Sequence, residues 1–144
     1  MRIKIKKTRD NVSLPKYQTS GAAGFDLHAA IDEVVTIEPN GIGAFPTGIA
    51  VEIPAGYELQ IRPRSGLAYK HHVTMLNGIG TIDSDFRGEM QVLLINYGNQ
   101  DFIVTPNMRI AQGIVARVEH VEWQEVDNLS ETDRGEGGLG STGH

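Results

Sequence analysis

The apolar residues of this chain come in short runs that are interrupted again and again by turn-forming residues. No long segment keeps the apolar period of about 3.6 residues that marks a helix, and glycine is abundant, at 17 of 144 residues. Runs rich in Val, Ile and Leu predict strands over residues 3–5, 34–37, 48–53, 57–62, 73–76, 90–96, 102–104 and 113–121. The dipeptides Asn77-Gly78 and Pro106-Asn107 are typical turns between them. We therefore predict an all-β fold, a sandwich or barrel, with one helical turn over residues 65–70 that Ser65 would cap.

Length and charge limit what such a chain can do. With 144 residues it is expected to form one domain with a sizeable core. A net charge of −5 disfavours binding of long nucleic acid, which requires many basic side chains on one face. The absence of cysteine excludes disulfides and thiolate metal sites. No segment resembles a signal peptide or an apolar membrane span, so we expect a cytoplasmic protein without membrane contacts.

The C-terminal segment differs in composition from the rest of the chain. We divide the sequence into a folded body, residues 1–127, and a flexible Gly-rich arm, residues 128–144. Glycine has no side chain to bury and loses much backbone freedom on folding, so the arm is expected to become ordered only on binding. Arg134 and the pair Ser141-Thr142 lie at either end of the glycines and suit a polyphosphate, whereas a plain spacer needs neither. An unstructured tail is the competing interpretation.

Two carboxylates, Asp83 and Asp85, lie among apolar residues just beyond the hairpin signal Asn77-Gly78. Acidic residues are depleted in strands, so their presence needs an explanation. One interpretation is that both aspartates cap a turn. The other is that one of them, held on a rigid hairpin, acts as a general base on a water molecule.

A second polar cluster comes where a strand is expected to turn into the short helix. Arg62, Arg64, Ser65 and Gly66 bring guanidinium, hydroxyl and backbone N–H groups within a few residues. These groups together favour an anion site, although a surface turn with solvated arginines is the simpler alternative.

Three other features carry less information. The segments 22–28 and 109–112 are each most simply a strand with one solvated polar residue. The neighbouring His71 and His72 would point to opposite faces of a strand, which disfavours a metal site. Trp123 is expected to pack at the edge of the body.

Taken in order, five segments resemble the five motifs of the trimeric dUTP pyrophosphatases, the dUTPases. The matching segments are residues 23–27, 64–68, 77–88, 109–112 and 134–143. Each is unspecific alone, but five in this order are highly specific. The resemblance implies a distorted jelly-roll-like β-barrel that assembles as a homotrimer. It also implies three sites between subunits, each built from the third motif of a second chain and the C-terminal arm of a third.

The resemblance also implies the reaction: Mg²⁺-dependent hydrolysis of dUTP to dUMP and pyrophosphate, with Asp83 activating the water that attacks the α-phosphorus. Uracil would contact Asn77 and the backbone around Gly80 and Ile82, and Phe86 would lie against the deoxyribose. The complete set of substrate-binding residues is Arg64, Ser65, Gly66, Asn77, Gly80, Thr81, Ile82, Phe86, Gln112, Arg134, Leu139, Ser141 and Thr142. The phosphates and water would hold Mg²⁺, with Asp26 in the outer shell through water only.

Two positions depart from the family pattern. Leu139 lies where the family usually has a phenylalanine stacked on uracil, and Phe86 replaces the usual tyrosine. Leucine offers apolar contact without a π-face, whereas Phe86 loses only a hydroxyl. Two alternatives to a dUTP diphosphatase stay open: an enzyme related to the dCTP deaminases, which share this barrel, and a non-enzymatic dUTP-binding trimer with a regulatory role.

Overall fold

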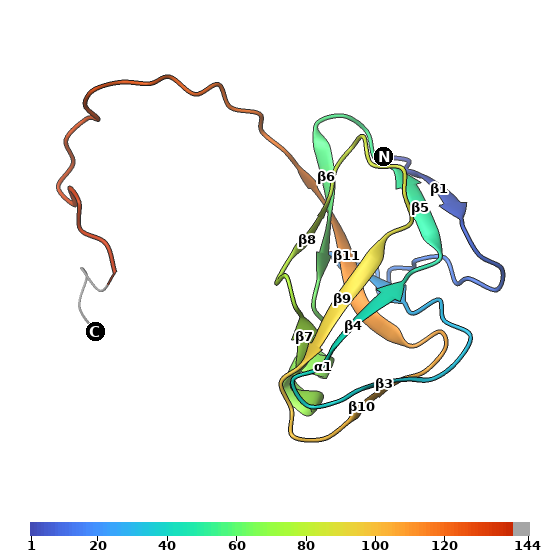
Figure 1. Cartoon of the computed structure of the whole chain (residues 1–144). Coiled ribbons are helices and arrows are strands. Elements are labelled where there is room, and N and C mark those ends of the chain that lie inside the picture. Colours follow the sequence, from blue (N-terminus) through green and yellow to red (C-terminus); the bar gives the residue numbers. More distant parts are fainter. Residues whose placement is uncertain (140–144) are drawn as a thin grey trace.

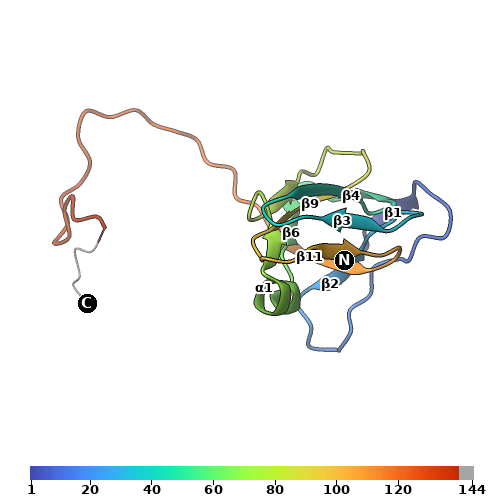
Figure 2. The ribbon, with the colours of Figure 1, turned by 60° about the horizontal axis from the view of Figure 1, so that its bottom comes forward.

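A four-stranded antiparallel sheet forms one layer of the structure, a computed structural model that describes residues 1–139. In spatial order its strands are β2 (Phe25–His28), β11 (Arg109–Arg117), β6 (Tyr57–Arg62) and β8 (Gly80–Ile82). Figures 1 and 2 show a second, three-stranded sheet beside it. That sheet consists of β4 (Ile42–Pro46), β9 (Gln91–Asn96) and β7 (Val73–Met75). Two further antiparallel pairs are β1 (Lys4–Lys7) with β5 (Ile49–Glu52), and β3 (Val35–Ile37) with β10 (Phe102–Val104).

The core lies between the sheets because their strands alternate buried and less buried residues. In β6, Leu59 and Ile61 are buried, whereas Glu58, Gln60 and Arg62 are only partly so. This alternation is the period-2 pattern of a strand with one face on a core. Other large side chains buried in the core are Leu27, Phe45, Ile49, Met90, Leu94 and Ile110. The remaining face of the four-stranded sheet is left free to carry polar groups.

The mostly β architecture predicted from the sequence is confirmed, and most expected strands are present. The sequence did not indicate β4 or β8, which are short and contain glycine or proline, residues that weaken strand propensity. β11 covers residues 109–117, so the predicted range 113–121 begins and ends too late. The helix α1 (Ser65–His71) is present, but its N-cap is Arg64, which makes no side-chain cap hydrogen bond. The prediction that Ser65 caps it is therefore wrong.

The expected hairpin near Asn77-Gly78 is also absent from the described chain. β7 pairs with β9 and β8 pairs with β6, so the turn joins two different sheets. Gly78 has a φ of 67°, a left-handed conformation that glycine adopts at little cost. Residues 83–90 consequently cross from one sheet to the other.

His71 and His72 do not lie in a strand, contrary to the prediction. His71 ends α1 and His72 is its left-handed C-cap, with a φ of 57°.

After β11 the chain leaves the sheets, and Figure 1 shows it running away from them as an arm. The N–H of Val118 still donates to the carbonyl of Gly56 at 3.0 Å. Trp123 is 90% exposed, so the expectation that it packs at the edge of the body is wrong. Among residues 1–139, no helix has the length and apolarity needed to cross a membrane.

Candidate active site

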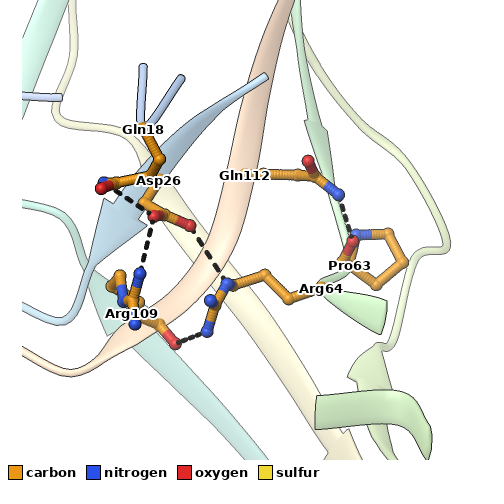
Figure 3. A network of polar contacts seen from close by, with 6 residues as sticks. All are labelled: Gln18, Asp26, Pro63, Arg64, Arg109 and Gln112. Carbon is orange, nitrogen blue, oxygen red and sulfur yellow. Dashed lines mark hydrogen bonds and ion pairs between the residues drawn. The ribbon is translucent and has the colours of Figure 1, made fainter. Parts of the chain in front are cut away.

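A buried carboxylate, Asp26 on β2, is the centre of a polar network (Figure 3). The Nε atom of Arg64 lies 3.1 Å from its Oδ1, and Nη1 of Arg109 lies 3.3 Å from its Oδ2. Nε2 of Gln18 donates to the same Oδ2 at 3.1 Å. Asp26 is only 8% exposed, so the interpretation of a solvated strand residue is wrong. Two guanidinium groups and an amide compensate the burial of its charge.

This network brings together residues that lie far apart in the sequence. Arg64 precedes α1, and its Nη1 also donates to the carbonyl of Arg109 at 3.1 Å. The family resemblance included the segment 109–112 but predicted no role for Arg109. No feature of the sequence indicated a role for Gln18. Arg62, which we had grouped with the anion site, instead donates from Nε to Oε1 of Gln60 at 2.9 Å.

Gln112 and Gly24 fix the backbone beside this network. Gln112 on β11 lies opposite Asp26 of β2 on one side and opposite Arg62 of β6 on the other. Its Nε2 donates to the carbonyl of Pro63 at 2.9 Å, which holds the segment that enters α1. A Cβ on Gly24 would lie 2.8 Å from Oε1 of Gln112, so only glycine lets the amide take this position.

The network and the start of α1 together form a positively charged cluster at the place where the sequence predicted an anion site. Ser65 and Gly66 begin the helix and are exposed, while Leu67 anchors it in the core. Burial is the main cause that lowers the pKa of His28, next to Asp26 in β2; the carboxylate of Asp26 opposes this shift, and the nearby arginines add to it. Around neutral pH the charge of the cluster therefore comes from its arginines.

A second group of expected site residues lines one cavity of about 280 Å³. Its walls include the expected residues Asn77, Gly80, Thr81, Ile82, Asp83 and Phe86. A Cβ on Gly80 would lie 3.4 Å from Nδ2 of Asn77, an ordinary van der Waals contact, so this amide lies beside the backbone of β8. Asp83 lines this cavity, whereas Asp85 is not among its lining residues. Both carboxylates also line a neighbouring cavity with Tyr57 and Arg117, so it is the cavity of Asn77 and Phe86 that distinguishes them.

The two groups lie at opposite edges of the four-stranded sheet. Asp26 is on β2 and the second cavity is bordered by β8, with β11 and β6 between them. Three strand spacings correspond to about 14 Å. Arg64, Ser65 and Gln112 do not line the cavity that contains Asp83. Within residues 1–139 of one chain, the expected site residues of the body thus form two separate clusters.

The expected tail residues that the structure describes, Arg134 and Leu139, lie on the arm, away from both clusters. Arg134 folds back locally, its Nε donating to the carbonyl of Gly137 at 2.8 Å. Leu139 is fully exposed. The expected contacts of Ser141 and Thr142 fall outside the described residues.

A protein-family model described as dUTPase matches residues 10–143. The chain belongs to the dUTPase family. The deoxyuridine 5'-triphosphate nucleotidohydrolase of Rickettsia prowazekii (strain Madrid E) is 54% identical over 142 residues, which cover 98% of this chain and 96% of the relative. That of Nautilia profundicola is 54% identical over 143 residues, covering 99% of each chain. The predicted enzyme class, a dUTP nucleotidohydrolase, is thereby confirmed.

The fold agrees with solved dUTPase structures. The Staphylococcus bacteriophage 80alpha dUTPase G164S mutant with dUpNHpp superposes with a TM-score of 0.90 at 24% identity, covering 99% of each chain. At this identity the likeness concerns the fold alone. The assignment of this dUTPase chain to its family rests on the sequence relatives.

Proposed function

We propose that the chain hydrolyses dUTP to dUMP and pyrophosphate, with Asp83 as the general base on a water molecule that attacks the α-phosphorus. The observation that carries this proposal is the placement of Asp83 in the cavity lined by Asn77, Gly80 and Phe86. A carboxylate at the wall of a nucleoside-sized cavity can accept a proton from water held between it and the substrate. The water oxygen then bonds to the α-phosphorus as the bond to the leaving pyrophosphate breaks.

The cavity is suited to a pyrimidine deoxynucleoside. The amide of Asn77 and the backbone beside Gly80, Thr81 and Ile82 provide donors and acceptors for the edge of uracil. The pattern of these groups disfavours cytosine, and the limited volume disfavours the methyl group of thymine. Phe86, which lies over Gly88, would pack on the deoxyribose and leave no room for a ribose 2′-hydroxyl.

The anion site would bind the phosphate chain. Arg64 offers a guanidinium, Ser65 and Gly66 begin α1, and Gln112 holds the segment in front of it. Guanidinium groups bind phosphate oxygens by charge-assisted hydrogen bonds. From the arm, Arg134, Ser141 and Thr142 would close over the γ-phosphate.

The donor set fits Mg²⁺ bound mainly by substrate. No group of three His, Cys, Asp or Glu side chains in the described part of the chain could hold a metal ion alone. Mg²⁺ commonly keeps several waters and binds substrate phosphates, and Asp26 offers one buried carboxylate for those waters. Bound in this way, the ion would neutralise charge on the phosphates. A phosphate that recruited Arg64 would free Oδ1 of Asp26 for this role.

We propose a homotrimer with a folded body, residues 1–127, and an exchanged arm, residues 128–144. The separation of Asp26 from Asp83 supports sites assembled from different subunits. Residues 128–139 of the arm are almost wholly exposed and form no core, so binding to a neighbour would offset the cost of ordering the arm. The strand β1 has one neighbour in the described sheets, which leaves an edge for another chain.

The activity is tested by measuring pyrophosphate release from dUTP, dCTP, dTTP and UTP, with and without Mg²⁺. We expect release from dUTP alone, and only with the ion. Release of ammonia from dCTP would indicate instead an enzyme related to the dCTP deaminases. Tight binding of dUTP without turnover would indicate a regulatory protein.

Replacing Leu139 with Phe is expected to tighten binding of a non-hydrolysable dUTP analogue by about 1 kcal/mol, roughly fivefold in affinity. Leucine already excludes water, so only the stacking of a ring on uracil is added. The gain should appear in KM or analogue affinity more than in kcat, because the base is remote from the bond that breaks. Calorimetric titration with the analogue measures the affinity. The Leu139→Ala variant is the matched control, because it removes the apolar contact of the leucine. Unchanged or weaker affinity of the Phe variant would show that another residue covers the uracil.

A further inference from the structure

Residues 83–88 form the loop that carries Asp83 and Phe86, and this loop is weakly attached to the sheets. It leaves the four-stranded sheet after β8 and enters the three-stranded sheet at β9. In the part of the chain that the structure describes, its hydrogen bonds close within the loop. The N–H of Phe86 donates to the carbonyl of Asp83 at 3.2 Å. Nη1 of Arg87 donates to the carbonyls of Ser84 and Phe86 at 2.6 and 2.9 Å. The position of the loop is therefore set at its two ends.

Together with the backbone of Met90, which accepts from the N–H of Thr47 and donates to the carbonyl of Ile49 at 3.0 Å each, Glu89 fixes the C-terminal end of this loop. Its Oε1 accepts the N–H of Gly48 at 2.8 Å and Nε of Arg9 at 2.9 Å, and its Oε2 accepts Nη2 of Arg9 at 3.3 Å. Gly48 has a φ of 71° and packs closely on Val12, since a Cβ there would lie 2.3 Å from Cγ2 of Val12, so only glycine fits this position. Glu89 thus binds the end of the loop to the turn between β4 and β5 and to the N-terminal segment.

The Glu89 side chain is 19% exposed and is held as a carboxylate. The hydrogen bond from Arg9 is the main cause that lowers the pKa of Glu89; Thr8 and Gly48 act in the same direction and burial opposes them. Bonds between a carboxylate and a guanidinium are stronger than neutral ones. Glu89 also lines the cavity of Asp83 and Phe86, where a bare carboxylate would repel an anionic nucleotide. Because Arg9 and Gly48 occupy its oxygens, it serves the site by holding the loop.

We propose, on the basis of the function proposed above, that the Arg9–Glu89 ion pair is a positioning device for the reaction. It holds the loop so that Asp83 and Phe86 face the same bound nucleotide. Asp83 acts on the attacking water, so its position is reported by kcat. Phe86 lies at the sugar, so its position is reported by the preference for dUTP over UTP. A pair that served only stability would change neither quantity in the folded enzyme.

The pair is tested with Arg9→Met, which removes both hydrogen bonds from Arg9 but leaves Glu89 bound to Gly48. We expect kcat for dUTP to fall about three- to tenfold, since displacements of catalytic groups by less than 1 Å can have effects of this size. The ratio of kcat/KM for dUTP over UTP should fall by a similar factor. Arg9→Lys keeps the charge and should retain more activity than Arg9→Met. Glu89→Gln should resemble Arg9→Met, and the double variant should be little worse than either single one.

The matched control is Lys4→Met. Nζ of Lys4 lies 2.9 Å from Oε1 of Glu52, so this pair also ties the N-terminal segment to a strand. Neither residue lines the cavity of Asp83. We expect kcat and the dUTP preference to be unchanged in this variant. Thermal unfolding of every variant ensures that the kinetics are measured on folded protein.

If Arg9→Met and Glu89→Gln fold and keep the wild-type kcat and dUTP preference, the inference is wrong, whatever the change in Tm. Should Glu89→Gln fail to fold, the comparison of Arg9→Met with Arg9→Lys decides alone. A wild-type chain inactive toward dUTP would instead refute the proposed function, and this inference with it. An active wild type with silent Arg9 and Glu89 variants refutes only the inference.

Discussion

Replacing Asp83 with Asn is expected to lower kcat for dUTP by about 10²–10⁴-fold, the usual contribution of a positioned general base. The amide of Asn keeps the size of the side chain but accepts no proton at neutral pH. The fold should be unaffected because Asp83 is exposed and lies in a loop. Affinity for a non-hydrolysable dUTP analogue should change little, since the uracil contacts proposed above come from Asn77 and the backbone of β8. Steady-state pyrophosphate release and calorimetric binding measure the two quantities separately.

Asp85→Asn is the matched control for this prediction. Asp85 belongs to the same loop and carries the same charge, but it does not line the cavity of Asn77 and Phe86. Its replacement should leave kcat within about twofold, because the side chain is exposed and does not line that cavity. If Asp85→Asn were the crippling change and Asp83→Asn nearly silent, the assignment of the base would be wrong.

The strands could be predicted largely because their information is local. β6 and β10 have the predicted bounds, since alternating apolar residues and the flanking Pro and Gly residues mark both ends. β8 has only three residues, Gly80–Ile82, and is a strand because β6 pairs with it. No pattern of three residues could indicate that. Asn77-Gly78 was correctly read as a turn, but its sequence does not show that the strands on either side join different sheets.

The site was harder to predict because its contacts are distant in sequence. Asp26 looked like a solvated strand residue, yet it pairs with Arg109, which is 83 residues away. Arg9 and Glu89 are separated by 80 residues and neither belongs to a recognisable pattern. The sequence shows that Gly24 is a glycine but not why: the amide of Gln112 occupies the space that a Cβ at this position would need. The candidate residues came instead from the resemblance to a family, and the structure groups them into two clusters.

Deleting residues 134–144 is expected to lower the activity toward dUTP by more than tenfold, because each lost charge-assisted bond to phosphate contributes about 1.5–3 kcal/mol. Light scattering should show that the truncated chain still forms a trimer, since the described residues of the deleted segment, 134–139, lie almost wholly exposed and away from the sheets. A monomeric wild type, or full activity after the deletion, would contradict the exchange of arms.

Mixing inactive chains distinguishes an exchanged arm from one that closes over its own subunit. Truncated chains supply Asp83, and full-length Asp83→Asn chains supply the arm. If each site takes its base and its arm from different subunits, one half of the sites receive an intact base and one half of those an arm, so about a quarter of the wild-type activity returns after random reassembly. If base and arm had to come from the same chain, no mixed trimer would contain an active site. The activity of the mixture is compared with that of each unmixed variant. Recovered activity would support sites built from different subunits, in which the cluster of Asp26 and the cluster of Asp83 of one chain belong to different active sites.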